Sequence, residues 1–121
     1  MKLCGIVISG NGRGAALGFP TANLAVEKGS DVPSPGVYAG LAIVDTKTYR
    51  AAIHIGPRPT FDDATPTVEA HILDFDATIY GQSICIDIRE KLRDIEKFDT
   101  IQALQAAIEF DCDKVRERIS L

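Results

Sequence analysis

The chain has 121 residues, of which 45% are hydrophobic and 25% charged, and its formal net charge at pH 7 is −4. This length suits one domain with one hydrophobic core, and no apolar stretch approaches the roughly 20 residues that a membrane-spanning helix needs. The acidic balance disfavours a general nucleic-acid binder, which usually carries a basic excess. We therefore expect a single domain over residues 1–121: a cytoplasmic monomer with neither a membrane nor a nucleic acid as partner.

The start of the chain carries one lysine and an apolar run too short for a secretory signal. Three cysteines, Cys4, Cys85 and Cys112, are an odd number without short spacings. That pattern favours neither a disulfide framework nor a cysteine-rich zinc site. We expect reduced, buried thiols, as is usual for a cytosolic protein.

The first predicted strand covers residues 3–9. It runs into residues 10–14, where three glycines in five positions predict a loop. Gly18 and Pro20 exclude a regular helix over residues 17–24.

Four further segments have the composition or alternation of strands: residues 37–44, 49–55, 68–75 and 83–88. Residues 45–48 join the first two as a hairpin loop, and a turn around Tyr80 and Gly81 joins the last two. None of these segments alternates with helices, so a parallel sheet is not indicated.

The end of the chain has the period of an amphipathic helix, with apolar residues at Ile101, Leu104, Ile108, Val115 and Ile119. Asp99 is the predicted N-cap, with Gln102 three residues later as in a capping box. Strands followed by one helix predict an antiparallel sheet or barrel with a helix packed outside.

The glycine cluster Gly10-Asn11-Gly12-Arg13-Gly14 is the first candidate for ligand binding. A dinucleotide-binding fingerprint would need a helix at once, which Gly18 and Pro20 prevent. Backbone N–H groups with one guanidinium could instead surround phosphates. The alternative is a glycine-rich turn without a ligand.

Thr21 and Asn23 are the second candidate. If this segment is extended, their side chains share one face and present a hydroxyl and an amide oxygen together. Such hard oxygen ligands suit Mg²⁺, which takes its other ligands from water and nucleotide phosphates. The alternative is that both side chains satisfy turn backbone.

Glu69 is the third candidate, a carboxylate in an otherwise apolar strand. Alternation places two sets of side chains on opposite faces: Glu69, His71, Leu73 and Phe75 on one, and Val68, Ala70, Ile72 and Asp74 on the other. As a general base, Glu69 would take the proton of an attacking alcohol, a role worth roughly 10²–10⁴ in rate. The alternative is a solvated edge glutamate. The two histidines, His54 and His71, lack a second ligand at metal spacing, so we expect them to pack or hydrogen-bond.

Residues 92–98 are the fourth candidate, because they combine the guanidinium of Arg93 with the ring of Phe98. Such a loop could close over a flat ring system. The alternative is a charged connector in which Phe98 staples the start of the helix.

The order and spacing of these motifs resemble the riboflavin kinase family from about residue 5 to about residue 118. The similar segments are Gly10 to Gly14, Leu17-Gly18-Phe19-Pro20-Thr21-Ala22-Asn23-Leu24, Pro35-Gly36-Val37-Tyr38, Ile55-Gly56-Pro57-Arg58-Pro59-Thr60-Phe61, Val68 to Phe75, Tyr80-Gly81, Leu92-Arg93 and Lys97-Phe98-Asp99. The most specific is Gly-Phe-Pro-Thr-Ala-Asn. The resemblance implies a six-stranded antiparallel Greek-key β-barrel with a C-terminal helix. It also implies ATP-dependent phosphorylation of the riboflavin 5′-hydroxyl, which yields FMN and ADP.

The resemblance also implies roles for single residues. Gly10, Gly12, Arg13 and Gly14 match the flap over the ATP phosphates. Thr21 and Asn23 match the residues that hold Mg²⁺ and the nucleotide, with Zn²⁺ or Mn²⁺ as alternative metals. Glu69 matches the catalytic base, and Tyr80 a position beside the nucleotide. Arg93 and Phe98 match the loop that closes on the flavin.

Two positions depart from the family pattern. Ala15-Ala16 stand where many relatives carry a basic residue, and Ile95 stands where an acidic one is common; we expect altered affinity rather than lost chemistry. Many bacterial relatives also carry an N-terminal adenylyltransferase domain, for which this chain has no room, so we expect a free-standing kinase or an excised module. Two other functions stay open: a catalytically weak flavin- or nucleotide-binding module with a regulatory role, and a small nucleic-acid-binding barrel.

Overall fold

The computed structural model describes residues 1–9, 21–27, 30–56 and 67–121. Its elements are the strands β1 (Lys2–Ser9), β2 (Ala22–Ala25), β3 (Gly36–Val44), β4 (Lys47–Ile55), β5 (Val68–Ile72) and β6 (Ser83–Arg93) and the helix α2 (Ile101–Arg118). The strands close into an antiparallel barrel in the order β1-β2-β5-β4-β3-β6. Since β2 lies beside β5, the order β2-β5-β4-β3 is a Greek key. The fold expected from the resemblance is thereby confirmed.

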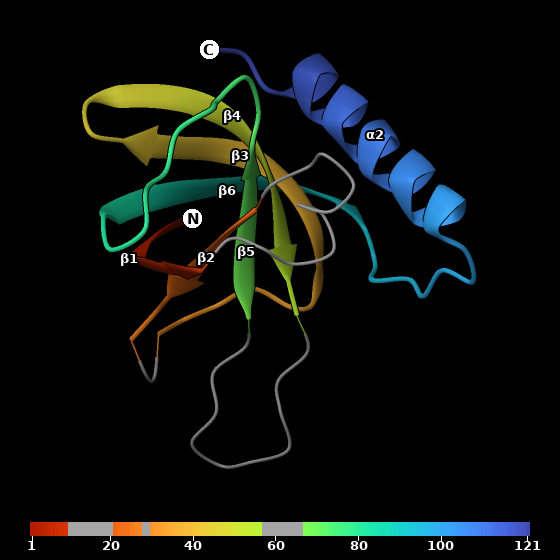
Figure 1. The fold of residues 1–121 in the computed structure, drawn as a ribbon, viewed down its shortest axis with the longest axis horizontal. Helices are drawn as coiled ribbons and strands as arrows, with labels where there is room; N and C mark the ends of the chain where they lie inside the picture. Colours follow the sequence, from red (N-terminus) through yellow and green to blue (C-terminus); the bar gives the residue numbers. More distant parts are fainter. Residues whose placement is uncertain (10–20, 28–29, 57–66) are drawn as a thin grey trace.

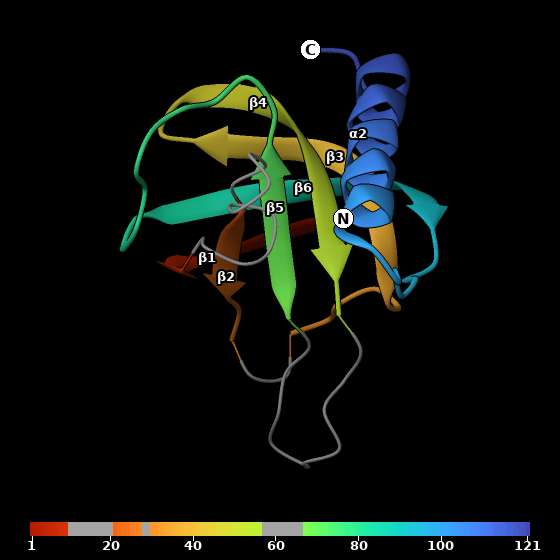
Figure 2. The same ribbon diagram turned by 45° about the vertical axis from the view of Figure 1, so that its right-hand side comes forward.

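Helix α2 lies outside the barrel and packs on β3 and β4, as Figure 1 and Figure 2 show. Its seat is a cluster of buried side chains from the barrel and the helix: Ala39, Leu73, Cys112, Val115 and Ile119. A second, larger cluster fills the barrel, to which β4 contributes Ile53 and Ile55 and β6 contributes Ile84, Ile86 and Ile88. No helix in the part of the chain that the structure describes is long and apolar enough to cross a membrane.

The hairpin between β3 and β4 is tighter than predicted. Val44 pairs with Lys47, so only Asp45 and Thr46 form the turn, with Asp45 at φ 55°. Two-residue hairpin turns favour such positive φ values because they match the twist of the strands, and aspartate tolerates them.

The predicted strand over residues 68–75 ends early, because the chain turns at Asp74, which has φ 57°. Beyond the turn the predicted alternation is wrong. Leu73 is buried in the cluster beneath α2, whereas Phe75 packs against the barrel core and lies edge-on to Tyr49, with 4.9 Å between the ring centroids. The predicted strand 83–88, in contrast, continues as β6 to Arg93.

The helix begins one residue later than predicted. Thr100, not Asp99, is the N-cap, and its Oγ1 accepts a hydrogen bond from the Ala103 N–H at 3.0 Å. Ile101 is 58% exposed, so the apolar side of the helix packs against the barrel only from the second helical turn onward.

The prediction of three reduced thiols is wrong for two of them. Cys4 and Cys85 are separated by 81 positions but lie directly opposite each other on β1 and β6, where they form a disulfide. The prediction holds for Cys112, which is free and buried. Sequence spacing could not reveal the pair, because strand register brings the two cysteines together.

Candidate functional site

A row of paired residues crosses five strands of the barrel. Asn23 on β2 lies opposite Glu69 on β5, Glu69 opposite His54 on β4, His54 opposite Val37 on β3, and Val37 opposite Arg93 on β6. Neighbouring strands are about 4.8 Å apart, so the row from Glu69 to Arg93 covers three spacings, on the order of 14 Å.

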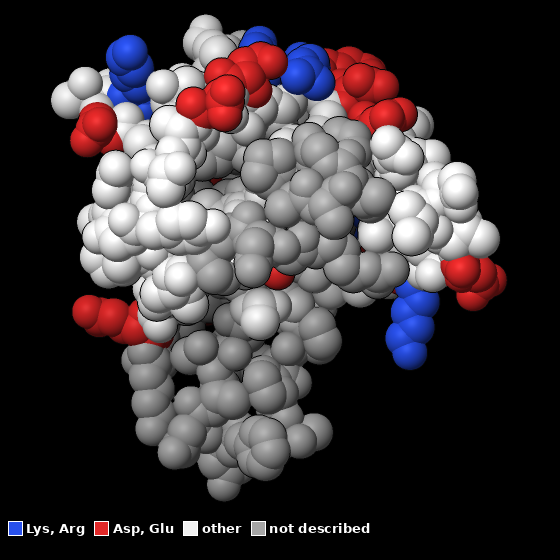
Figure 3. All heavy atoms as spheres, viewed as in Figure 1, with Lys and Arg blue, Asp and Glu red and all other residues white. Residues whose placement is uncertain are grey.

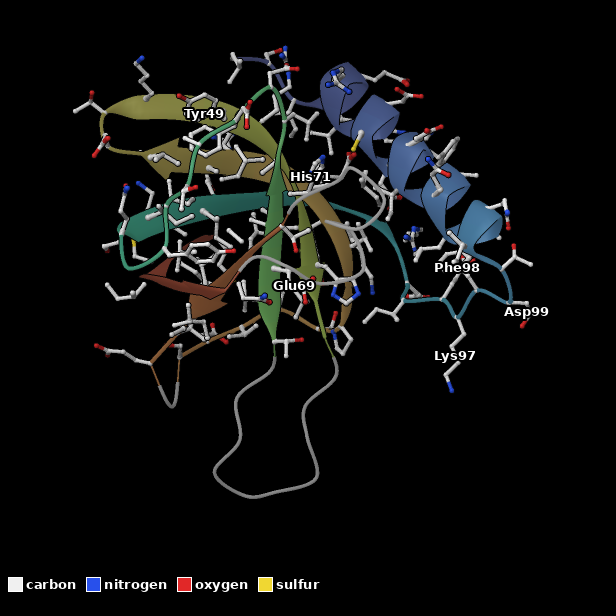
Figure 4. The ribbon with its side chains drawn as sticks, in the orientation of Figure 1. Tyr49, Glu69, His71, Lys97, Phe98 and Asp99 are labelled. Atoms are coloured by element: carbon white, nitrogen blue, oxygen red, sulfur yellow. A yellow bond between two sulfur atoms is a disulfide. The ribbon has the colours of Figure 1, made fainter. Side chains whose placement is uncertain are left out.

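Glu69 points away from the barrel interior, because its neighbours Val68 and Ala70 are buried inside and side chains alternate along a strand. Figure 4 shows Glu69 and His71 on β5. The Glu69 side chain is half-buried. Among the residues that the structure describes, no hydrogen bond or ion pair engages its carboxylate. A half-buried carboxylate without a partner can accept a proton from a bound alcohol.

His54, directly across from Glu69, is half-buried. Its Nδ1 is buried and has no hydrogen-bond partner within the described ranges. The expectation that His54 packs or hydrogen-bonds stays a prediction, since its Nδ1 makes no hydrogen bond among the described residues. An unsatisfied buried nitrogen beside a carboxylate is a feature that sequence reasoning missed.

A cavity of about 410 Å³ opens between β1, β2, β5 and the segment that leads to β6. It is lined by two of the predicted nucleotide-binding residues, Thr21 and Tyr80, together with Phe75, Asp76 and Thr78, among others. Thr21 Oγ1 is buried and has no hydrogen-bond partner in the described chain. An unsatisfied hydroxyl oxygen of this kind fits a hard metal ion such as Mg²⁺.

Glu69 and Asn23 do not line this cavity, because their side chains point to the outer face of the sheet whereas the cavity is lined by inward side chains. The pair Ala22 and Ala70, which does line it, is the neighbouring rung of the β2–β5 ladder. The structure thus brings Asn23 directly opposite Glu69 and places both one rung away from the cavity that holds Thr21. In the face shown in Figure 3, the charged side chains lie mainly around the periphery.

Arg93 and Phe98 also lie together. The Arg93 guanidinium carbon is 5.7 Å from the centroid of the Phe98 ring. The same guanidinium donates from Nε and Nη2 to both carboxylate oxygens of Asp111 on α2, at 2.9 and 2.8 Å. Hydrogen bonding to Asp111 raises the pKa of Arg93 above its usual value. Arg93 is therefore a paired cation and not an open one.

Asp111 was also missed from sequence, although a signal was present. It lies three residues after Ile108 and four before Val115, so it interrupts the apolar side of the helix with a carboxylate. A charged residue at such a position needs a buried partner. The remaining predicted residues, Gly10, Gly12, Arg13 and Gly14, lie outside the described residues.

Comparisons with known proteins bear on this arrangement. A family model described as flavokinase (riboflavin kinase) matches residues 1–119. The bifunctional riboflavin kinase/FMN adenylyltransferase of Bacillus subtilis (strain 168) is 39% identical over 110 residues, which cover 88% of this chain and 35% of that protein. The RNA-binding riboflavin kinase RibR of the same organism is 34% identical over 120 residues, or 98% of this chain and 51% of RibR.

A solved structure described as riboflavin kinase from Trypanosoma brucei superposes with a TM-score of 0.72 and 28% sequence identity, over 96% of this chain and 77% of that one. The chain spans about a third of the length of the bifunctional relative and about half of RibR. The match to the family model covers nearly all of the chain and agrees with the barrel and its helix. The chain belongs to the riboflavin kinase family.

Proposed function

We propose that this protein transfers the γ-phosphate of ATP to the 5′-hydroxyl of riboflavin, giving FMN and ADP. The observation that carries the proposal is the rung formed by Asn23 and Glu69, one step from the cavity that contains Thr21 and Tyr80. It provides a carboxylate for the acceptor alcohol on the outer face of β5, one rung from the cavity that we assign to the nucleotide.

In this proposal Glu69 orients the riboflavin 5′-hydroxyl and removes its proton as the oxygen attacks the γ-phosphorus. Phosphoryl transfer depends mainly on positioning and charge neutralisation. A single general base is therefore sufficient, and no covalent intermediate with the protein is needed. The nucleotide occupies the cavity, with Tyr80 at its side. Arg13 and the N–H groups of the glycine cluster would cover the phosphates, as the family resemblance implies.

Thr21 is the residue we assign to the metal, with Asn23 as the second oxygen ligand. The unpartnered Oγ1 of Thr21 supports this assignment. Mg²⁺ in this place would neutralise phosphate charge, and we propose it over Zn²⁺ because the two donor groups are hard oxygens; Mn²⁺ shares this preference.

The flavin ring would lie at the other end of the row, against Phe98. A substrate with a reacting hydroxyl at one end of a polyol chain and a flat ring at the other would follow the row from Glu69 past Val37. The Phe98 side chain is half-buried and its ring is held beside Arg93. Aromatic rings stack favourably in offset arrangements, so Phe98 suits an isoalloxazine ring.

The test is the variant Glu69→Gln, assayed for FMN by chromatography with fluorescence detection. Removal of the base should lower turnover by roughly 10²–10⁴-fold and leave riboflavin affinity nearly unchanged. Glu90→Gln, an exposed glutamate on β6, is the matched control and should keep wild-type turnover. Near-normal turnover of Glu69→Gln would show that the base has been assigned incorrectly.

The same assay addresses the alternative of a catalytically weak binding module, for which wild-type protein would bind riboflavin tightly and form no FMN. We further propose a cytoplasmic monomer that does not bind nucleic acid. One relative is named as RNA-binding, so an RNA mobility-shift measurement on this chain is the direct check.

A further inference from the structure

Asp111 is the only charged residue that is buried among the described ones. It projects from α2 toward the end of β6, where it binds Arg93 through two parallel hydrogen bonds. This fork-to-fork geometry fixes the plane of the guanidinium as well as its position.

Arg93 also holds the segment that follows β6. Its Nη1 donates to the carbonyl oxygen of Asp94 at 3.1 Å, and its guanidinium lies against the Phe98 ring. The guanidinium is thus bonded to α2 on one side and to the segment 94–98 on the other. An arginine held in this way organises the segment and has few donors left for a ligand.

A second ion pair joins the same two elements and makes a useful contrast. Arg118 on α2 donates to Glu90 on β6 at 2.9 Å. The two side chains of this pair are 45% and 44% exposed, whereas those of Arg93 and Asp111 are only 21% and 7% exposed. Exposed pairs contribute little, whereas loss of one partner of a buried pair leaves an uncompensated charge. The Arg93–Asp111 pair is therefore the more strongly buried link between α2 and β6, and Arg93 connects it to the segment 94–98; the Lys91–Asp94 ion pair, which also reaches this segment, is largely exposed.

We propose that Asp111 is a positioning residue that acts through Arg93 to fix the Phe98 ring for the flavin. The inference deepens the proposed function and rests on it. Asp111 does not touch the substrate; it keeps Phe98 in the binding orientation before the flavin arrives. Because such preorganisation lowers the cost of binding and leaves the reacting groups unchanged, it acts on riboflavin affinity and KM and not on kcat.

The experiment is a double-mutant cycle with Asp111→Asn and Phe98→Leu, in which the riboflavin dissociation constant is measured by quenching of flavin fluorescence. Asp111→Asn should weaken binding about tenfold and raise KM similarly, with kcat within about twofold of wild type. In the Phe98→Leu background, Asp111→Asn should have little further effect, because Asp111 acts through the ring that is missing. Glu90→Gln is the matched control and should bind riboflavin like wild type.

Additive effects of the two substitutions, equal losses in Asp111→Asn and Glu90→Gln, or unchanged affinity in Asp111→Asn would each overturn the proposal. If Asp111→Asn does not fold, as judged by circular dichroism, Arg93→Lys replaces it, since it keeps the charge and loses the fork. The cycle uses affinity alone, so it remains decisive even if the wild type forms no FMN, an outcome that would refute only the proposed function. A wild type that binds no riboflavin would refute both.

Discussion

The contact between α2 and the barrel offers a sharp test of the packing. Val115 is 0% exposed in the cluster that seats the helix. Val115→Ala removes two buried methyl groups, worth about 0.8 kcal/mol each in transfer free energy, and leaves a cavity that adds to the loss. We expect the free energy of unfolding to fall by about 2–3 kcal/mol.

Urea denaturation followed by circular dichroism measures this loss. Phe110→Ala on the same helix is the control: it removes a larger side chain, but Phe110 is 59% exposed and its ring lies 5.3 Å from the Lys114 ammonium in a cation–π pair. That variant should lose less than about 1 kcal/mol. The urea m-value of both should stay at the wild-type value if helix and barrel unfold together. A loss below about 0.5 kcal/mol in Val115→Ala, or a larger loss in Phe110→Ala, would refute the described seat of the helix.

Two further predictions concern the cysteines. Burial raises the pKa of the Cys112 thiol from its ordinary value of 9.0 to about 11. Because the folded state favours the neutral thiol, the contribution of Cys112 to the free energy of unfolding is fully present below pH 9 and is lost as pH rises from 9 to 11. Alkylation of Cys112 at pH 8 should accordingly be slow in native protein and fast in denaturant, and equal rates would contradict its burial. Reduction of the Cys4–Cys85 bond, whose cysteines are 81 positions apart, should lower the free energy of unfolding by about 4.5 kcal/mol, as the loss of the loop constraint on the unfolded chain predicts. The melting temperature with and without reductant measures this loss of stability, and a thiol titration that gives three thiols confirms complete reduction. An unchanged melting temperature would mean that the bond does not constrain the chain.

The position of Arg93 changes how the flavin end of the site is understood. Sequence analysis predicted that Arg93 and Phe98 act together on the flavin, and the structure places them in contact. However, the guanidinium is bound to Asp111, so we propose that the direct flavin contact is made by Phe98 and that Arg93 supports it. A family motif names residues near a ligand without saying which of them support the others.

Several parts of the fold could be predicted from the sequence because they depend on neighbours along the chain. The strand periodicity of residues 83–88 and the helical period after residue 100 both reflect which face is buried, so the first part of β6 and nearly all of α2 were predicted in place. The predicted ends of elements were wrong where the backbone conformation of a single residue ends a strand or begins a helix. The turn at Asp74 separates Leu73 from Phe75, and Thr100 displaces Asp99 as the N-cap.

The sequence by itself determined the helix, every strand except β2, for whose segment it excluded only a helix, and, through its motifs, the family to which the chain belongs. Only the tertiary structure decided which distant residues meet: Asn23 with Glu69, Cys4 with Cys85, and Arg93 with Asp111. The physical reason is that periodicity records whether a side chain faces the core, whereas a partner is chosen by strand register and helix docking. Those depend on the whole barrel closing at once, and a shift of one residue in register would turn every outward side chain of a strand inward.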